Sequence, residues 1–156
     1  AACGAITPLE PDGDWLYDHI ELQSTTAVWE VTVIALEKLD FPIGTGLDPS
    51  TLTATSGWRV SLAPFRADGY RQQAVVEYSP GAGGTGWDVR VRVKKQLNMA
   101  LANPLDLSYA EWEWTDDDTV TAGILLQHIR ACLRPVLEVE EPEDDPLEKW
   151  RIDPGS

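Results

Sequence analysis

The most regular pattern of hydrophobic and polar positions lies in residues 87–97, where the two kinds of residue alternate. The apolar positions are Trp87, Val89, Val91 and Val93, and the polar positions between them are Asp88, Arg90, Arg92 and Lys94. A period of two predicts a β-strand with one buried face and one face in water. Similar patterns predict strands within residues 51–65 and 70–79, and a short edge strand in residues 109–114.

Two segments have apolar residues spaced by three and four, which predicts amphipathic helices. The first spans residues 26–39 and follows the N-cap hydroxyls of Ser24, Thr25 and Thr26. The β-branched residues 31–34 favour a strand here, but the good helix formers in residues 35–39 favour the helix. The second helix spans residues 119–133, because three aspartates precede it and Pro135 follows it.

The two helices are expected to cover the apolar face of the sheet. The predicted apolar positions are Val28, Val31, Ala35 and Leu39 in the first helix, and Ile124, Leu125, His128, Ile129 and Cys132 in the second. This order predicts a two-layer α+β domain, with an antiparallel sheet of three or four strands packed by an N-terminal and a C-terminal helix. The domain spans residues 24–135, between an N-terminal tether, residues 1–23, and a mobile acidic tail, residues 136–156.

Composition narrows the classes of function. The 156 residues include 26 acidic and 12 basic side chains, and the formal net charge is −14. This charge argues against nucleic acid as a partner, because phosphate neutralisation needs a basic surface. An apolar content of 43% and seven tryptophans are enough for one folded core.

The basic residues gather in the predicted sheet and form a candidate binding face. Arg90, Arg92 and Lys94 share one strand face, and neighbouring strands can add Arg59 and Arg71. One interpretation is a face that recognises an anionic partner. A second is a solvated face whose cross-strand pairs with Glu77 and Asp88 contribute only ~0.2–1 kcal/mol each. A third is a face covered by the acidic tail.

Tryptophans form a second candidate feature, in the segment Glu111-Trp112-Glu113-Trp114. Alternation places Trp112 and Trp114 on one strand face. If exposed, they offer a stacking platform for a sugar or an anchor for a partner. If buried, they belong to the core.

Catalytic, metal and cofactor sites are not predicted. His19 beside Asp18 has no nucleophile motif nearby, and the glycine-rich residues 81–86 lack the Lys-Ser/Thr of a phosphate-binding loop. His128 and Cys132 lie four residues apart on one helix face, which is either half of a metal site or a coincidence of helical spacing. We therefore expect a protein that is not an enzyme.

The N-terminal segment Ala1-Ala2-Cys3-Gly4 has small residues on both sides of a cysteine. It resembles the lipobox of bacterial lipoproteins, in which a signal peptidase cleaves before a diacylglyceryl-modified cysteine. The alternatives are an ordinary cysteine near the terminus or a disulfide between Cys3 and Cys132. If Cys3 is acylated, Cys132 is a lone thiol, expected to be a small buried apolar group.

This resemblance implies a lipid anchor on Cys3, and Gly4 in place of Asp implies the periplasmic face of the outer membrane. The order of elements is similar to that of small lipoproteins of outer-membrane assembly and transport machinery, and the composition resembles envelope lipoproteins of high-GC bacteria such as planctomycetes. These likenesses imply a non-enzymatic structural or accessory subunit of a cell-envelope complex, with an envelope protein as partner. The alternative is a small binding module that takes a polyanionic glycan or lipid headgroup on the basic sheet face.

Overall fold

The computed structural model of the protein describes residues 10–21, 24–62 and 69–133. The predicted lipidation site Cys3 and the predicted acidic tail 136–156 lie outside the described residues.

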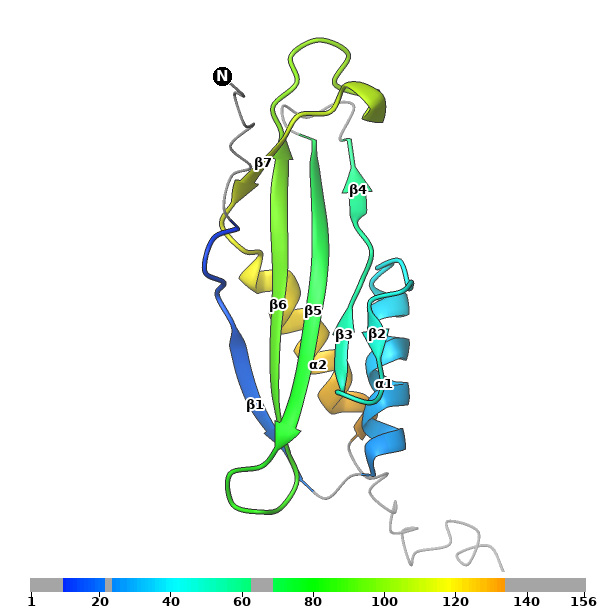
Figure 1. The fold of residues 1–156 in the computed structure, drawn as a ribbon, viewed down its shortest axis with the longest axis vertical. Helices are drawn as coiled ribbons and strands as arrows, with labels where there is room; N and C mark the ends of the chain where they lie inside the picture. Colours follow the sequence, from blue (N-terminus) through cyan, green and yellow to red (C-terminus); the bar gives the residue numbers. More distant parts are fainter. Residues whose placement is uncertain (1–9, 22–23, 63–68, 134–156) are drawn as a thin grey trace, which may run out of the picture.

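One antiparallel sheet dominates the fold (Figure 1). The described residues contribute seven strands, ordered β1-β6-β5-β3-β2, with β4 also pairing with β5 and β7 with β6. The strands are β1 (Leu16–Ile20), β2 (Leu47–Asp48), β3 (Thr53–Thr55), β4 (Arg59–Ser61), β5 (Tyr70–Pro80), β6 (Trp87–Asn98) and β7 (Trp112–Thr115).

The long hairpin of β5 and β6 forms the centre of the sheet, paired from Tyr70↔Leu97 to Pro80↔Trp87. Two short strands share each outer edge of this hairpin. On β6, β1 pairs with residues 87–91 and β7 with residues 95–98. On β5, β4 pairs with residues 70–72 and β3 with residues 75–77.

Two α-helices, α1 (Thr25–Lys38) and α2 (Thr119–Leu133), lie against one face of the sheet, and a short 3-10 helix, η1 (Leu107–Tyr109), precedes β7 (Figure 1). The Ser24 hydroxyl caps α1 by accepting the Ala27 N–H at 3.1 Å. The Asp118 carboxylate caps α2 by accepting the Thr121 N–H at 3.0 Å. Neither helix, nor any other in the described part of the chain, has the length and apolarity needed to cross a bilayer.

The core lies between the helices and the alternating apolar residues of β5 and β6. Buried residues from the sheet are Ala74, Val76, Tyr78, Val89, Val91 and Val93, and from the helices Val28, Ala35, Leu36, Ala122, Leu125 and Ile129. The intervening residues of β5 and β6 point away from the helices, onto what we call the open face. These are Arg71, Gln73, Val75, Glu77, Ser79, Asp88, Arg90, Arg92, Lys94, Gln96 and Asn98.

The prediction of a sheet with three or four strands is wrong, because the sheet has seven. Strand β1 lies in the segment assigned to the tether. Residues 51–65, expected as one strand, contain β3 and β4, which are separated by residues 56–58. Strands of two or three residues are too short to produce a recognisable alternation, so sequence patterns miss them.

The buried face of α2 also differs from the prediction. It consists of Ala122, Leu125, Ile129 and Leu133, whereas the expected core residue Cys132 is exposed and has a free thiol. Ile124 is 42% exposed. The true face is displaced around the helix because it begins at Ala122, whose small side chain gave a weak hydrophobic signal.

Candidate functional site

Four of the five predicted basic residues come together on the open face: Arg71, Arg90, Arg92 and Lys94. Arg59 does not join them, because it pairs with Gln72 in the ladder and so lies on the helix-covered side. Its guanidinium donates to the Leu39 carbonyl and the Gln72 side-chain oxygen. It also lies 4.3 Å from the centroid of the Phe41 ring. Arg59 therefore connects β4 to the end of α1.

Carboxylates of the same chain neutralise three of these four cations. Arg90 Nε donates to Glu77 Oε2 at 2.5 Å, and Lys94 Nζ lies 3.1 Å from Glu10 Oε1. Arg92 binds Asp117 at two points, with Nε 2.8 Å from Oδ2 and Nη2 3.1 Å from Oδ1. The Arg92 and Asp117 side chains are only 8% and 3% exposed.

Residues 10–15, here called the N-terminal strap, explain why Arg92 is buried. Glu10 Oε1 lies 3.2 Å from Arg92 Nη1, and the Asp14 N–H donates to Asp117 Oδ2 at 3.0 Å. Gly13 lies so close that a Cβ there would be 2.2 Å from Arg92 Cζ. The strap thus crosses the open face directly above a buried ion pair.

The fourth cation, Arg71, lies among tryptophans. Its guanidinium carbon is 4.2 Å from the ring centroid of Trp58 and 4.6 Å from that of Trp112. Trp114 adjoins this stack, with its ring centroid 5.9 Å from that of Trp58. We call Trp58, Arg71, Trp112 and Trp114 the Trp–Arg cluster.

Arg71 has no carboxylate partner among the described residues; its Nε donates to Gln96 Oε1 at 2.7 Å. Burial lowers the pKa of its guanidinium. The three tryptophans are neither fully buried nor fully exposed. The cluster is therefore a preformed aromatic surface that surrounds an unneutralised charge.

The sequence pointed to part of this cluster. The alternation of Trp112 and Trp114 placed them on one strand face, which the register with Asn98 and Gln96 bears out. Trp58 was not identified. Trp58 lies two positions before Val60, so strand alternation puts both side chains on one face of the sheet. Val60 pairs with Arg71, and this pairing places Trp58 on the same face as Arg71.

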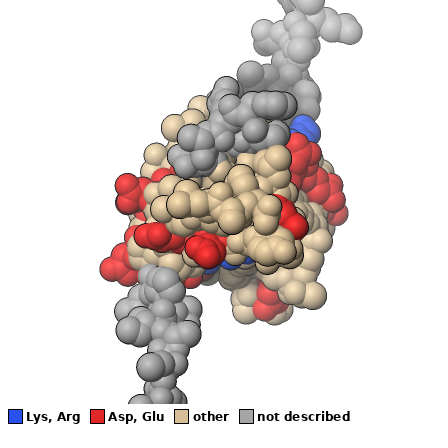
Figure 2. Space-filling model, turned by 90° about the horizontal axis from the view of Figure 1, so that it is seen from above, with Lys and Arg blue, Asp and Glu red and all other residues tan. Residues whose placement is uncertain are grey.

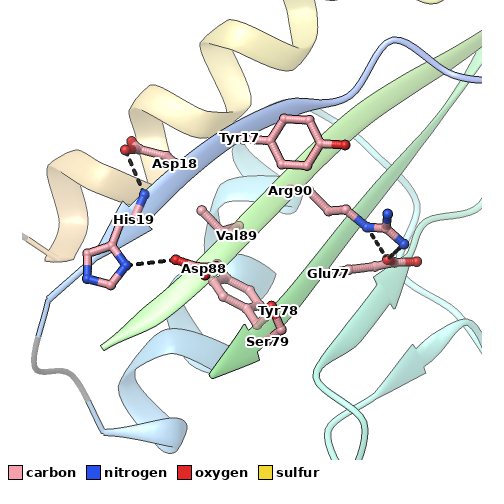
Figure 3. Close-up of a pocket in the computed structure, with 9 residues that line it drawn as sticks. All are labelled: Tyr17, Asp18, His19, Glu77, Tyr78, Ser79, Asp88, Val89 and Arg90. Atoms are coloured by element: carbon pink, nitrogen blue, oxygen red, sulfur yellow. Dashed lines mark hydrogen bonds and ion pairs between the residues drawn. The ribbon is translucent and has the colours of Figure 1, made fainter. Parts of the chain in front are cut away.

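A separate depression of about 610 Å³ lies on the open face, near the ends of β1 and β6 (Figure 3). Its polar lining includes Tyr17, His19, Glu77, Asp88 and Arg90. His19 Nδ1 lies 2.8 Å from Asp88 Oδ1, and the second Asp88 oxygen accepts the Ala82 N–H at 3.3 Å.

The order of His19, Asp88 and Ser79 in this depression does not match a Ser-His-Asp triad. The register pairs His19 with Asp88 and Asp88 with Ser79, so Asp88 stands between the other two. Neighbouring strands are about 4.8 Å apart, which puts the His19 and Ser79 backbones roughly 10 Å apart. A Ser-His-Asp triad needs the histidine in the middle.

No group of three or more His, Cys, Asp or Glu side chains within residues 10–21, 24–62 and 69–133 is arranged to hold a metal ion. Four of the predicted basic residues and the tryptophans of the Trp–Arg cluster lie on the open face. No protein-family model matches this chain, and no curated protein matches it either.

Proposed function

We propose that this protein is a non-enzymatic lipoprotein that docks a protein partner on its Trp–Arg cluster, as an accessory subunit of a cell-envelope complex. In this proposal Cys3 carries the lipid that holds the domain at the periplasmic face of the outer membrane. The observation that carries the docking function is the Arg71 guanidinium, stacked between Trp58 and Trp112 without a carboxylate partner in the described residues.

The composition and rigidity of the cluster support a protein partner. Tryptophan and arginine are the residues most enriched at the energetic centres of protein interfaces. Packing already restricts the rings and the guanidinium, so docking costs little side-chain entropy. The partner we propose presents a carboxylate to Arg71 and apolar groups to Trp112 and Trp114.

The alternative, a binding module for polyanionic glycans or headgroups, receives less support. It needs several free cations, but Arg90, Arg92 and Lys94 already pair with Glu77, Asp117 and Glu10. A polyanion would have to displace these carboxylates, which belong to the same chain.

Co-purification of membrane proteins with the natively expressed protein tests the docking function. Trp112→Ala and Arg71→Gln should each lower recovery of a stoichiometric partner at least tenfold, as expected for a hot spot worth about 2 kcal/mol. Tyr17→Ala is the matched control, because Tyr17 is an aromatic residue on the same face, 70% exposed and outside the cluster. Unchanged recovery with both cluster variants would reject the docking function.

The anchor requires its own test. Intact-mass measurement of the native protein should show acyl and glyceryl groups on Cys3, and Cys3→Ser should move the protein from the membrane to the soluble fraction. A bare or disulfide-bonded Cys3 in the native protein would reject the anchor while leaving the docking surface to be judged separately.

A further inference from the structure

Residues 99–110, in the connection between β6 and β7, expose several large apolar side chains. Leu101 is 98% exposed, and Met99, Leu105, Leu107 and Tyr109 are each at least half exposed. We call this segment the apical loop. It contains no lysine or arginine. Contiguous apolar exposure of this kind marks a surface that meets a membrane or a partner.

The backbone of the apical loop is held by defined hydrogen bonds. Asn98 Oδ1 accepts the N–H groups of Ala100 and Glu111, both at 3.1 Å, and its Nδ2 donates to the Pro104 carbonyl at 3.2 Å. Asp106 caps η1 by accepting the Ser108 N–H at 2.9 Å. These bonds fix the loop in a conformation that presents its apolar side chains outward.

The apical loop occupies one end of the elongated domain, and the β5–β6 turn occupies the other (Figure 1). That turn, residues 81–86, contains only Gly, Ala and Thr. Seen from the loop end, the described residues are mostly uncharged at the centre, with acidic side chains around them and few basic ones (Figure 2). Of these two described segments, the apical loop therefore exposes large apolar side chains and the β5–β6 turn has none.

The N-terminal strap begins at Glu10, in the half of β6 nearer the apical loop, and leads into β1 at Leu16. Glu10 contacts Lys94, four residues before the end of β6, a rise of about 13 Å along the strand. Glu10 lies seven positions after Cys3, a reach of at most about 25 Å when extended. A bilayer that holds a lipid on Cys3 can therefore touch the apical loop.

We propose that the apical loop inserts its apolar side chains into the surface of the bilayer to which Cys3 is anchored. This inference rests on the proposed lipid anchor. The absence of basic residues in the loop and the acidic surroundings favour a zwitterionic lipid surface, reached by apolar burial and insensitive to salt. Leu101 enters most deeply, and Tyr109 lies at headgroup level, where aromatic residues with a polar tip are favoured.

Insertion would also set the orientation of the domain. The long axis would stand away from the bilayer, and the Trp–Arg cluster would face sideways into the periplasm. The anchor makes a weak insertion sufficient, because tethering raises the effective concentration of the loop at the surface.

The test uses the full chain with Cys132→Ser, a change at an exposed position, so that only Cys3 couples to a maleimide lipid. The coupled protein is placed on phosphatidylcholine vesicles, and amide hydrogen exchange is compared with that of the uncoupled protein. Exchange in residues 99–110 should slow at least fivefold on coupling, with no change in residues 81–86. The slowing should persist at high salt.

Variants make the test specific. Leu101→Gln with Leu105→Gln should abolish the slowing, whereas Val120→Gln, at an apolar residue 73% exposed on α2, should retain it. Unchanged exchange in the coupled protein would overturn the inference, even if native Cys3 proves to be lipidated. Protection that appears in native membranes but not on vesicles would also overturn it, because the loop would then contact a protein. The lipid is attached to Cys3 chemically in this experiment. Neither result therefore depends on whether Cys3 is lipidated in the cell.

Discussion

Arg92 and Asp117 form a two-point ion pair on the open face of the sheet, with Arg92 Nε 2.8 Å and Nη2 3.1 Å from the carboxylate oxygens. Arg92 comes from the centre of β6, and Asp117 from the connection between β7 and α2. The N-terminal strap lies over the pair and binds both residues. One buried contact thus holds together three parts of the chain that are far apart in sequence.

Breaking this pair should be far more costly than breaking its exposed neighbour. Asp117→Asn leaves a buried guanidinium without its main counter-charge, and we expect a loss of about 3 kcal/mol in the free energy of unfolding. The control is Glu77→Gln, whose partner Arg90 has a side chain 45% exposed, with an expected loss below about 1 kcal/mol. Urea denaturation measures both, and equal losses would contradict the assignment of Arg92 as a buried structural cation.

The strap needs glycine at position 13. In Gly13→Ala, the new Cβ would be 2.2 Å from Arg92 Cζ, and the guanidinium cannot move aside without leaving Asp117. We expect a loss of about 1–3 kcal/mol and faster amide exchange in residues 10–15. Gly83→Ala is the matched control, because a Cβ there meets nothing within 4 Å. If Gly13→Ala is as stable as Gly83→Ala, the strap is not docked on Arg92.

The buried hydroxyl of Tyr78 predicts a loss of stability at high pH. The Thr32 hydroxyl donates to the Val28 carbonyl at 2.7 Å, which leaves Thr32 Oγ1 to accept from the Tyr78 hydroxyl, also at 2.7 Å. Burial raises the pKa of Tyr78 from its ordinary value of 10.0 to about 12. The folded state therefore favours the protonated phenol, so the contribution of Tyr78 to stability is constant below about pH 10 and falls as the pH rises toward 12.

Alkaline denaturation measures this loss, which is on the order of 2 kcal/mol. Tyr78→Phe should remove it, whereas Tyr17→Phe, at an exposed tyrosine, should not.

Thr32→Val should be more destabilising at neutral pH than Tyr78→Phe, because it leaves a buried phenol without its acceptor. The reverse order would show that the hydroxyl pair does not form.

Asp118 predicts a loss of stability in acid. Burial alone would raise the pKa of its carboxyl, but hydrogen bonds from Thr121 and Gln72 and the charge of Lys95 outweigh it and lower the pKa. The stabilisation is therefore complete above the unfolded pKa of about 4 and is lost as the pH falls below it. Asp118→Asn preserves a good N-cap but removes the charge, so wild type and variant should converge in stability toward pH 2. Asp116→Asn, at an exposed neighbour, should show no such convergence.

Part of the fold followed from patterns that extend over many residues. The alternation in residues 87–97 predicted β6, whose Val89, Val91 and Val93 are all buried. The spacing of apolar residues predicted α1 and α2 within one or two residues of their ends. Each of these elements is long enough for burial of one side to appear as a periodic pattern.

The sequence-based prediction was poorer for residues whose burial depends on contacts with other elements of the fold. Cys132 was expected in the core and is exposed, because the packing of α2 against the sheet places Ile129 and Leu133 inward instead. Arg59 was grouped with the basic face and lies on the opposite side, because the break at residues 56–58 shifts the register of β4 against β5 by one residue relative to that of β3.

The sequence by itself determined which long segments are helix and strand and which face of β6 is apolar, because these depend on periodicity along the chain. Only the tertiary structure decided that Arg92 is buried, that Arg71 lies between Trp58 and Trp112, and that a segment assigned to a tether forms an edge strand. Those outcomes depend on contacts between residues tens of positions apart. Such contacts depend on the register of the strands and on where the N-terminal strap crosses the sheet. Local patterns of polarity do not encode either of these.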